Sequence, residues 1–364
     1  MKKLLFAAVT LDVGGIETAL LTLLNLLVEN YEITLVLEKK QGLFLNDLKP
    51  KIKVIDYTPS NNKIVIIRKI VNFVKQFMFK LKYKNKFNFS CSYATYSNPD
   101  AFVARNASNN SALWCHLDYL SFFNNDKEKL RNFFEEKQYQ NFRKIIFVSK
   151  RSRENFLKVF PEIKEKTICI NNLIDYKKIL ANSNDKIEEQ EIIKPNVTTF
   201  INIGRHEEKQ KKLSRIIESA RLLKQDNDTK DKFQIIFVGD GEDTKNYEEL
   251  IKKYNLENEI ILLGRKKNPY PYLKLADCTI LTSDYEGCPV VFVESMVLNK
   301  PVITTDVSGV DELKEEHYAL ITQKDENSIY NTMKNFIEQG FKIQEKFDPE
   351  KYNKIILEKL EKLF

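Results

Sequence analysis

Short apolar runs alternate along the chain with longer stretches in which apolar residues recur at helical spacing. In the first half, apolar runs predict strands over residues 4–9, 33–37, 53–55, 87–91, 112–115, 145–148 and 167–170. Helical patterns separate several of these runs, for example over residues 17–29 and 127–140. Because strands that alternate with helices make right-handed crossovers, the pattern predicts a parallel sheet covered by helices.

The alternation breaks over residues 181–197, which are mostly polar and charged and include Lys194-Pro195, so we interpret them as a linker. The pattern then restarts and predicts strands over residues 200–203, 235–238, 260–263, 279–281 and 302–304, with helices over 213–223, 244–254, 270–275 and 289–298. Two doubly wound α/β domains follow, residues 1–180 and 198–345, with a last helix in 346–364 that packs back on the N-terminal domain. Since ligands bind at the carboxyl ends of such strands, we expect the site in the cleft between the domains.

Composition narrows the class of protein. The 364 residues are 43% hydrophobic and 30% charged, which excludes a disordered chain. Five cysteines without C-x-x-C spacing predict reduced, mostly buried thiols of a cytosolic protein, and three scattered histidines argue against a zinc site. The first apolar run is too short for a signal peptide, and no stretch approaches the roughly 20 apolar residues of a spanning helix. We therefore expect a cytoplasmic protein that can lie on the inner face of the membrane.

The net charge of +7 is concentrated in residues 63–87, which contain eight basic residues and no acidic one. Apolar residues recur there at helical spacing, which predicts a basic amphipathic helix. Such a helix is typical of proteins that bind anionic membrane surfaces, here through Arg68, Lys69, Lys75, Lys80 and Lys82. The alternative is a helix packed on the core with a solvated lysine face. Nucleic acid is not an expected partner, because no nucleic-acid-binding motif accompanies the charge.

Two glycine-containing turns are candidate anion sites. Gly14-Gly15 follows the first predicted strand and opens a helix whose N–H groups could meet an anion, although a plain tight turn explains it equally well. Gly204-Arg205 follows a strand of the second domain, and Lys211 comes shortly afterwards within a basic cluster. A forked Arg and a point-charge Lys suit a diphosphate. A solvated basic loop is the alternative, and Lys209 or Lys212 could replace Lys211.

Two glutamates bracket the start of a predicted helix. Glu286 lies in the loop after the strand 279–281, and Glu294 lies more than one turn into the helix that Pro289 introduces. Glu294 is flanked by apolar residues, so it needs a hydrogen-bonding partner. Carboxylates in these places can hold sugar hydroxyls while helix N–H groups bind a phosphate. The alternative is a structural ion pair between Glu294 and an Arg or Lys.

The segment EGCPVVFVESMVLNKPVITTD, with seven residues between Glu286 and Glu294, resembles the signature of retaining glycosyltransferases of family 4. Further similar segments are GGIE, FVSKRSRENF, NNLID, NIGR and FVGDGE, in the same order along the chain. The resemblance implies the GT-B architecture, with two facing Rossmann-like domains and the active site in the cleft between them.

The resemblance also implies roles for individual residues. Arg205 and Lys211 would hold the donor diphosphate in place of a metal, Glu294 the ribose, and Glu286 the transferred sugar. His116 falls where the family often has a histidine beside the donor sugar, and a satisfied structural histidine is its alternative. The donor-binding set is completed by Gly15, Gly239, Gly287, Cys288, Pro289, Val290 and Val291. Cys288 departs from the larger apolar residue that is usual there.

The implied activity is transfer of a sugar, with retention, from a nucleotide-diphosphate sugar such as a UDP-sugar to a glycan or lipid-linked glycan acceptor of bacterial cell-surface polysaccharide synthesis. No metal or other cofactor is expected. The acidic triplet Asp226-Asn227-Asp228 has the D-x-D pattern of metal-dependent glycosyltransferases, but its polar surroundings favour a solvated turn. Two alternatives remain: a nucleotide-sugar epimerase of GT-B fold, and a non-catalytic, membrane-associated partner subunit of a glycosyltransferase.

Overall fold

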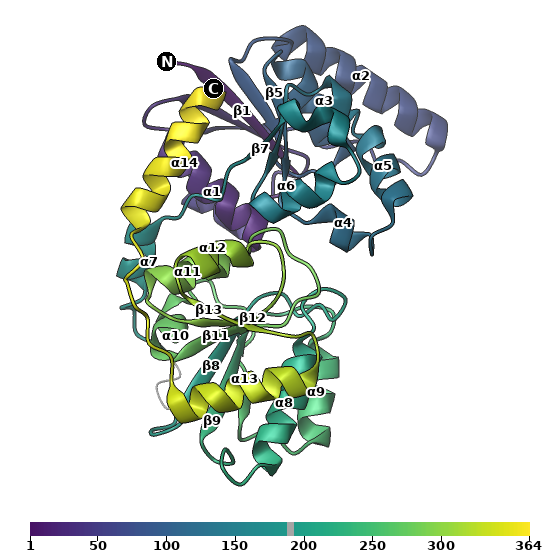
Figure 1. The fold of residues 1–364 in the computed structure, drawn as a ribbon. Coiled ribbons are helices and arrows are strands. Elements are labelled where there is room, and N and C mark those ends of the chain that lie inside the picture. Colours follow the sequence, from purple (N-terminus) through teal and green to yellow (C-terminus); the bar gives the residue numbers. More distant parts are fainter. Residues whose placement is uncertain (188–192) are drawn as a thin grey trace. The chain divides into compact units, whose positions relative to one another are not determined.

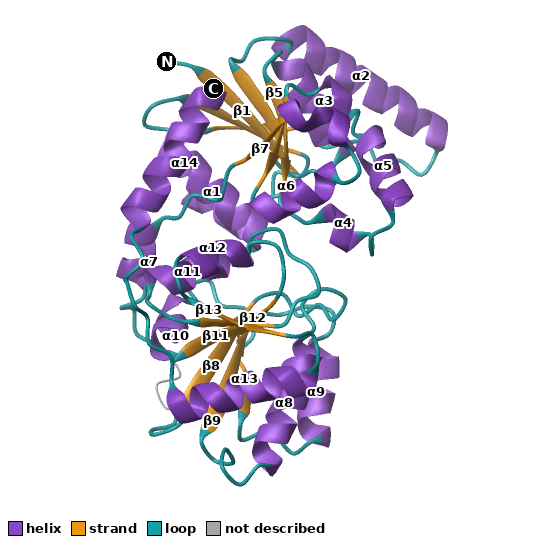
Figure 2. Ribbon diagram, in the orientation of Figure 1, coloured by secondary structure: helices purple, strands orange, loops and turns teal. Residues whose placement is uncertain are grey.

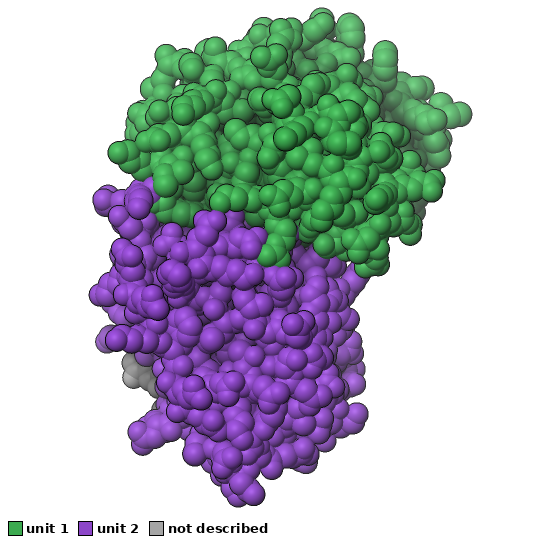
Figure 3. All heavy atoms as spheres, in the orientation of Figure 1, with its two compact units in different colours: residues 1–173, 352–364 green, residues 174–351 purple. Residues whose placement is uncertain are grey.

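A computed structural model describes residues 1–187 and 193–364 of the chain. These residues form two units, Met1–Leu173 with Tyr352–Phe364 and Ile174–Lys351 (Figure 3). The first unit thus ends before the predicted boundary at residue 180, because helix α7 (Tyr176–Asn182) packs on α10 (Tyr270–Leu275) and α11 (Val290–Val297) of the second unit. Of the predicted linker 181–197, residues 188–192 lie outside the described residues.

The first unit is built on seven parallel strands in the order β3-β2-β1-β4-β5-β6-β7 (Figures 1 and 2). The strands are β1 (Lys3–Ala8), β2 (Glu32–Leu37), β3 (Lys53–Asp56), β4 (Phe89–Ser92), β5 (Ser111–Cys115), β6 (Lys144–Phe147) and β7 (Thr167–Cys169). Each of them coincides with a predicted strand. Most of their residues are buried because helices cover both faces of a parallel sheet.

The α-helices of this unit are α1 (Gly15–Leu27), α2 (Val65–Tyr83), α3 (Asn98–Ala107), α4 (Tyr119–Phe122), α5 (Lys127–Glu136) and α6 (Lys150–Leu157). The predicted helix 127–140 is shorter than expected, because Gln138 adopts a left-handed conformation with φ of 53° and the chain continues as a 3₁₀ turn. The last helix, α14 (Pro349–Leu363), contributes buried Ile356 and Leu360. Its end is held by a hydrogen bond from the Asn110 amide to the Leu363 carbonyl and by contact of Phe364 with Phe89.

The second unit contains six parallel strands in the order β10-β9-β8-β11-β12-β13. The strands are β8 (Thr198–Ile203), β9 (Phe233–Val238), β10 (Ile260–Leu262), β11 (Cys278–Leu281), β12 (Val302–Thr305) and β13 (Ala319–Thr322). The first five were predicted. β13 was missed because it is a four-residue edge strand in which Thr322 is the buried residue, so it lacks the long apolar run of the others.

Besides α7, α10 and α11, the second unit has α8 (Leu213–Gln225), α9 (Thr244–Lys253), α12 (Val310–Glu315) and α13 (Glu326–Gln339). One core is formed where α8, α9 and α13 pack on the sheet, around Phe200, Ile217, Ile235 and Met333. All five cysteines are free and four of them are buried, as predicted. Among the described residues, no helix is both long enough and apolar enough to cross a bilayer.

Candidate active site

The candidate site lies in the second unit, where the order of the strands changes direction. β8 and β11 are neighbours, and the chain moves outward from β8 to β9 and β10 on one side and from β11 to β12 and β13 on the other. The loops that leave the carboxyl ends of β8 and β11 therefore diverge, and ligands of open α/β sheets bind at such a point. These two loops carry Arg205 and Lys211 on one side and Glu286 on the other.

Three side chains converge on the buried carboxylate of Glu286, which is 5% exposed. The Lys211 ammonium donates to Oε1 at 2.6 Å, the Ser283 hydroxyl donates to the same oxygen at 2.7 Å, and the Gln210 amide donates to Oε2 at 3.3 Å. A buried carboxylate is costly unless it is paired and hydrogen-bonded. Lys211 and its neighbours therefore offset the cost of burying Glu286 and fix the direction of its carboxylate.

The structure separates the three lysines between which the sequence left the choice open. Lys211 contacts the Glu286 carboxylate. Lys212 instead has a left-handed backbone with φ of 53°, and its ammonium lies 3.7 Å from Glu208 and 4.0 Å from Asp284. Lys209 is exposed. Lys211 is therefore the lysine that the loop directs to the predicted sugar-contacting glutamate.

Glu294 occupies the second turn of α11 and is 6% exposed. The Tyr270 hydroxyl, from α10, donates to Glu294 Oε1 at 3.0 Å. Burial raises the pKa of Glu294 to about 7, and the hydrogen bond from Tyr270 acts in the opposite direction. Within the described residues no Lys or Arg forms an ion pair with Glu294, so the alternative of a structural ion pair is wrong. Tyr270 was missed because it precedes Glu294 by 24 residues, on a different helix.

The turn into α11 places backbone groups beside the two glutamates. Pro289 precedes the helix with φ of −57° and ψ of 126°, so the helix begins at Val290 and not at the predicted Pro289. The first N–H groups of a helix have no acceptor within the helix and can bind an anion or a hydroxyl. Cys288 is closely approached by Gly309, at which an added Cβ would lie 2.7 Å from the Cys288 Cα. Gly309 has φ of 93°, which also favours glycine, and sequence reasoning did not single it out.

Arg205 and Gly239 follow neighbouring strands. The Arg205 side chain is 69% exposed and its guanidinium lies 3.2 Å from Glu207. Gly239 has φ of 153°, and a Cβ there would lie 1.8 Å from the Gly204 carbonyl oxygen. Gly239 thus supports the loop that carries Arg205 by allowing close backbone packing, which is a different role from the predicted contact with the donor.

The sequence and the fold were compared with those of known proteins. Residues 183–354 match the family described as glycosyl transferases group 1. The match covers α11, both glutamates, and Arg205 and Lys211 of the loop after β8. A GT-B glycosyltransferase is the protein class that these findings support.

Curated relatives agree with this class. The chain is 27% identical over 93% of its length, and 91% of the relative, to the Campylobacter jejuni N-acetylgalactosamine-N,N'-diacetylbacillosaminyl-diphospho-undecaprenol 4-alpha-N-acetylgalactosaminyltransferase. It is 34% identical to the uncharacterized glycosyltransferase MJ1059 of Methanocaldococcus jannaschii, over 47% of this chain. That alignment covers only 41% of the archaeal protein, so it relates a part of each chain.

Solved structures establish the fold. Anabaena HepE in complex with UDP-glucose is similar with a TM-score of 0.77 and 21% identity, over the full length of both chains. WaaG, a glycosyltransferase involved in lipopolysaccharide biosynthesis, is similar with a TM-score of 0.68 and 12% identity, over 97% of this chain and 99% of that one. The predicted GT-B architecture is thereby confirmed.

The remaining predicted residues lie in the first unit. Gly15 begins α1, and a Cβ there would meet nothing within 4 Å, so packing does not require glycine at this position. His116 follows β5 and is buried beside Tyr93, with ring centroids 4.3 Å apart. Among the described residues its Nε2 has no hydrogen-bond partner, and burial lowers the pKa of His116 to about 3, so the ring is neutral. Arg68, Lys69, Lys75, Lys80 and Lys82 lie on α2.

Three further acidic residues, Asp118, Asp226 and Asp228, have structural roles. Asp118 caps α4 and accepts a hydrogen bond from the Asn155 amide at 2.7 Å. In the D-x-D triplet, the Lys334 ammonium lies 2.6 Å from Asp226 and 3.2 Å from Asp228. The hydrogen bond from Lys334 is the main reason that the pKa of Asp226 is lowered to about 2. In the parts of the chain that the structure describes, no three His, Cys, Asp or Glu residues cluster in a way that could hold a metal ion.

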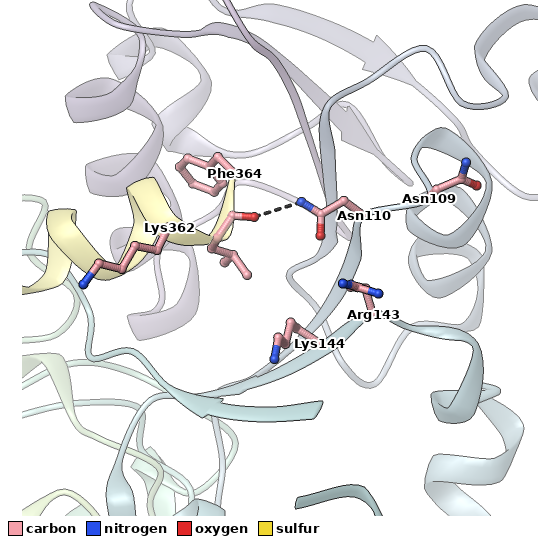
Figure 4. A pocket seen from close by; sticks show the side chains of 7 residues that line it. Asn109, Asn110, Arg143, Lys144, Lys362 and Phe364 are labelled. Carbon is pink, nitrogen blue, oxygen red and sulfur yellow. Dashed lines mark hydrogen bonds between the residues drawn. The ribbon is translucent and has the colours of Figure 1, made fainter. Parts of the chain in front are cut away.

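The first unit has a pocket beside the amino ends of β5 and β6, apart from the residues of the candidate site (Figure 4). It is lined by Asn109, Asn110, Arg143, Lys144, Lys362, Leu363 and Phe364. The hydrogen bond from Asn110 to the Leu363 carbonyl crosses one side of it. Because α/β sheets bind ligands at the carboxyl ends of their strands, this pocket is not part of the candidate active site.

Proposed function

We propose that the protein is a metal-independent, retaining glycosyltransferase that uses a nucleotide-diphosphate sugar, most simply a UDP-sugar. Its acceptor would be a glycan or a lipid-linked glycan of bacterial cell-surface polysaccharide synthesis. The observation that carries the proposal is the juxtaposition of Glu286, Lys211 and the start of α11 at the switch point of the second sheet. Glu294 lies on the same helix, with its carboxylate held by Tyr270.

In this proposal each group has a chemical task. Arg205 and Lys211 supply positive charge to the diphosphate, which becomes more negative as the sugar leaves. Glu294 binds the ribose hydroxyls, for which a buried carboxylate with one tyrosine partner has acceptor capacity to spare. Glu286 contacts the sugar, and the N–H groups from Gly287 to Val291 contact sugar and phosphate.

Catalysis then rests on positioning and on stabilising the leaving group. The acceptor attacks from the side of the leaving phosphate, and a phosphate oxygen accepts the proton of the acceptor hydroxyl. The guanidinium of Arg205 is exposed, so a ligand can reach it although the Glu207 carboxylate lies 3.2 Å away. His116, neutral because of its burial, would serve as a hydrogen-bonding group near the sugar and not as a cation.

The relatives support the substrate classes. The name of the Campylobacter jejuni relative describes sugar transfer to a diphospho-undecaprenol-linked saccharide, and HepE was solved with UDP-glucose. A Staphylococcus aureus relative, 30% identical over 47% of this chain, is named for capsular polysaccharide biosynthesis. These names describe other proteins, and they motivate a UDP-sugar and a lipid-linked glycan as the first substrates to test.

The test is a two-stage assay on the full chain. A panel of nucleotide sugars is screened by thermal shift, in which a bound donor raises the melting temperature in proportion to its affinity and concentration. The donor that stabilises the protein is then incubated with glycan acceptors, and the product is analysed by NMR. We expect a new glycosidic bond with the anomeric configuration of the donor. Conversion of the donor to its epimer, or an inverted product, would contradict the proposal.

A further inference from the structure

Few residues of helix α2 pack against the rest of the first unit. Phe79 is its one buried residue among those the structure describes, and its ring contacts Tyr57 and Phe102 at centroid distances of 5.4 and 6.2 Å. Asn72, one further residue on this side, accepts a hydrogen bond from the Ser60 backbone at 2.6 Å. Figure 1 shows α2 running along the outside of its unit. The helix is thus anchored on one face only.

The opposite face of α2 is apolar and exposed. Its side chains are between 41% and 70% exposed: Ile66, Ile67, Ile70, Phe73, Val74, Phe77, Met78 and Leu81. At about 100° per residue, these eight positions fall within one arc of about 140°. We call them the apolar stripe. A contiguous stripe of this kind on a protein surface marks an interaction site. The alternative of a helix that packs its apolar side on the core is wrong.

Basic residues border the apolar stripe on both sides. By the same helical geometry, Lys69 and Lys80 lie along one edge, and Arg68, Lys75 and Lys82 along the other. Lys75 donates to the Thr58 carbonyl at 2.6 Å, and Lys80 and Lys82 lie over aromatic rings. Within the described residues no carboxylate forms an ion pair with any of the five. The border is therefore positive without internal compensation.

We propose that α2 is an interfacial helix that docks the first unit on an anionic lipid bilayer. The apolar stripe enters the boundary between headgroups and acyl chains, and the bordering Lys and Arg side chains extend to the lipid phosphates. A second copy of the chain fits the surface less well, because two copies joined through their apolar stripes would bring the basic borders together. The inference rests on α2 alone and does not depend on the proposed catalytic function.

Binding to vesicles tests the proposal with the full chain. Vesicles of phosphatidylcholine with phosphatidylglycerol are compared with vesicles of phosphatidylcholine alone in a flotation assay. We expect the protein to float with the anionic vesicles only, and high salt to weaken the binding. Reversing three border charges, in the variant Arg68→Glu/Lys69→Glu/Lys82→Glu, should weaken binding about 100-fold. The matched control Lys245→Glu/Lys252→Glu/Lys253→Glu makes the same charge change on α9 of the second unit and should bind like the unmodified protein.

The apolar stripe is tested with Phe73→Ser/Phe77→Ser, which should weaken binding about 10-fold or more. Its control, Leu275→Ser/Ile355→Ser, removes two similarly exposed apolar residues elsewhere and should have no effect. A second measurement does not rely on loss of binding: in the variant Phe77→Trp, brominated lipid should quench the introduced indole, while buried Trp114 should stay unquenched. Equal binding of both charge variants, an introduced indole that brominated lipid does not quench, or a dimer that Phe73→Ser/Phe77→Ser dissociates would overturn the proposal.

Discussion

At the scale of residues, two carboxylates of the candidate site are buried in different ways. Glu286 is surrounded by donors, with Lys211 and Ser283 within 2.7 Å of one oxygen. Glu294 has a tyrosine as its hydrogen-bonding partner, and burial raises its pKa to about 7. The direction of Glu286 is therefore fixed by its ion pair and hydrogen bonds, while Glu294 changes charge near neutral pH. This difference leads to a pH dependence that belongs to Glu294.

We predict that Glu294→Gln removes a pH dependence of stability. The pKa of Glu294 is raised from 4.5 to about 7 in the folded protein, so the folded state holds its proton more tightly than the unfolded state. This contribution is present below about pH 4.5 and is lost as the pH rises through about 7. The free energy of unfolding of the second unit should fall by on the order of 3 kcal/mol over this range, relative to the Gln variant.

Hydrogen exchange of the β11 and α11 amides measures this difference, because it reports on the second unit itself. The Gln side chain keeps the size of Glu and can still accept the hydrogen bond from Tyr270, which makes it the appropriate control. A constant difference between the two proteins from about pH 4.5 to about pH 8 would contradict the assigned burial of an ionisable Glu294.

At the scale of elements, the apolar runs predicted twelve of the thirteen strands that the structure describes, and the order of strands then brings the loops after β8 and β11 together. The sequence also placed Glu286, Glu294 and Lys211 in or near these loops. It could not identify Tyr270 or Gly309, because these residues come from separate elements and meet the site only through the tertiary fold. For α2, helical spacing indicated an apolar stripe but not whether the stripe faces the core or the solvent. That direction depends on the few residues, such as Phe79, that pack on the rest of the unit.

Helix α14 packs on the first unit through one of its faces, and substitutions on its two faces test this packing. Leu360 of α14 is 1% exposed, so Leu360→Ala should destabilise the first unit by about 2–5 kcal/mol through lost burial and a cavity. Ile355 lies on the same helix and is 48% exposed, so Ile355→Ala should change stability by only about 0.5 kcal/mol.

Fluorescence of Trp114 during urea unfolding measures this effect, because this single tryptophan lies on β5 of the first unit. Equal shifts of the unfolding midpoint in the two variants would show that α14 does not pack as described. A large effect of Ile355→Ala alone would mean that the helix presents its other face to the unit.

At the scale of the whole molecule, the groups proposed to bind the donor and the helix proposed to bind lipid lie in different units. The proposed donor-binding groups lie in Ile174–Lys351, while the basic, apolar helix α2 lies in the first unit. The net charge of +7 is thus largely a property of one helix and its flanks, and the rest of the chain is close to neutral. Donor binding and lipid binding are expected to respond to different substitutions.

The proposed sugar transfer does not require a metal ion. The D-x-D carboxylates are engaged by Lys334, and the proposed diphosphate site is supplied with positive charge by Arg205 and Lys211. We therefore expect sugar transfer to continue at an unchanged rate in excess EDTA. A rate that falls to background in EDTA and returns with Mn²⁺ would contradict metal independence and return attention to Asp226 and Asp228.

We propose that the loop after β8 places Lys211 at a nucleotide-diphosphate site beside Glu286. Calorimetric titration of UDP, GDP, dTDP and ADP into the full chain, in the presence of EDTA, tests it most directly. We predict that one of these nucleotides binds, that Lys211→Met weakens it about 10- to 100-fold, as expected for loss of a charged hydrogen bond, and that the matched variant Lys209→Met leaves it within about 2-fold. Binding of no nucleotide, or equal affinities for Lys211→Met and the unmodified protein, would contradict the account.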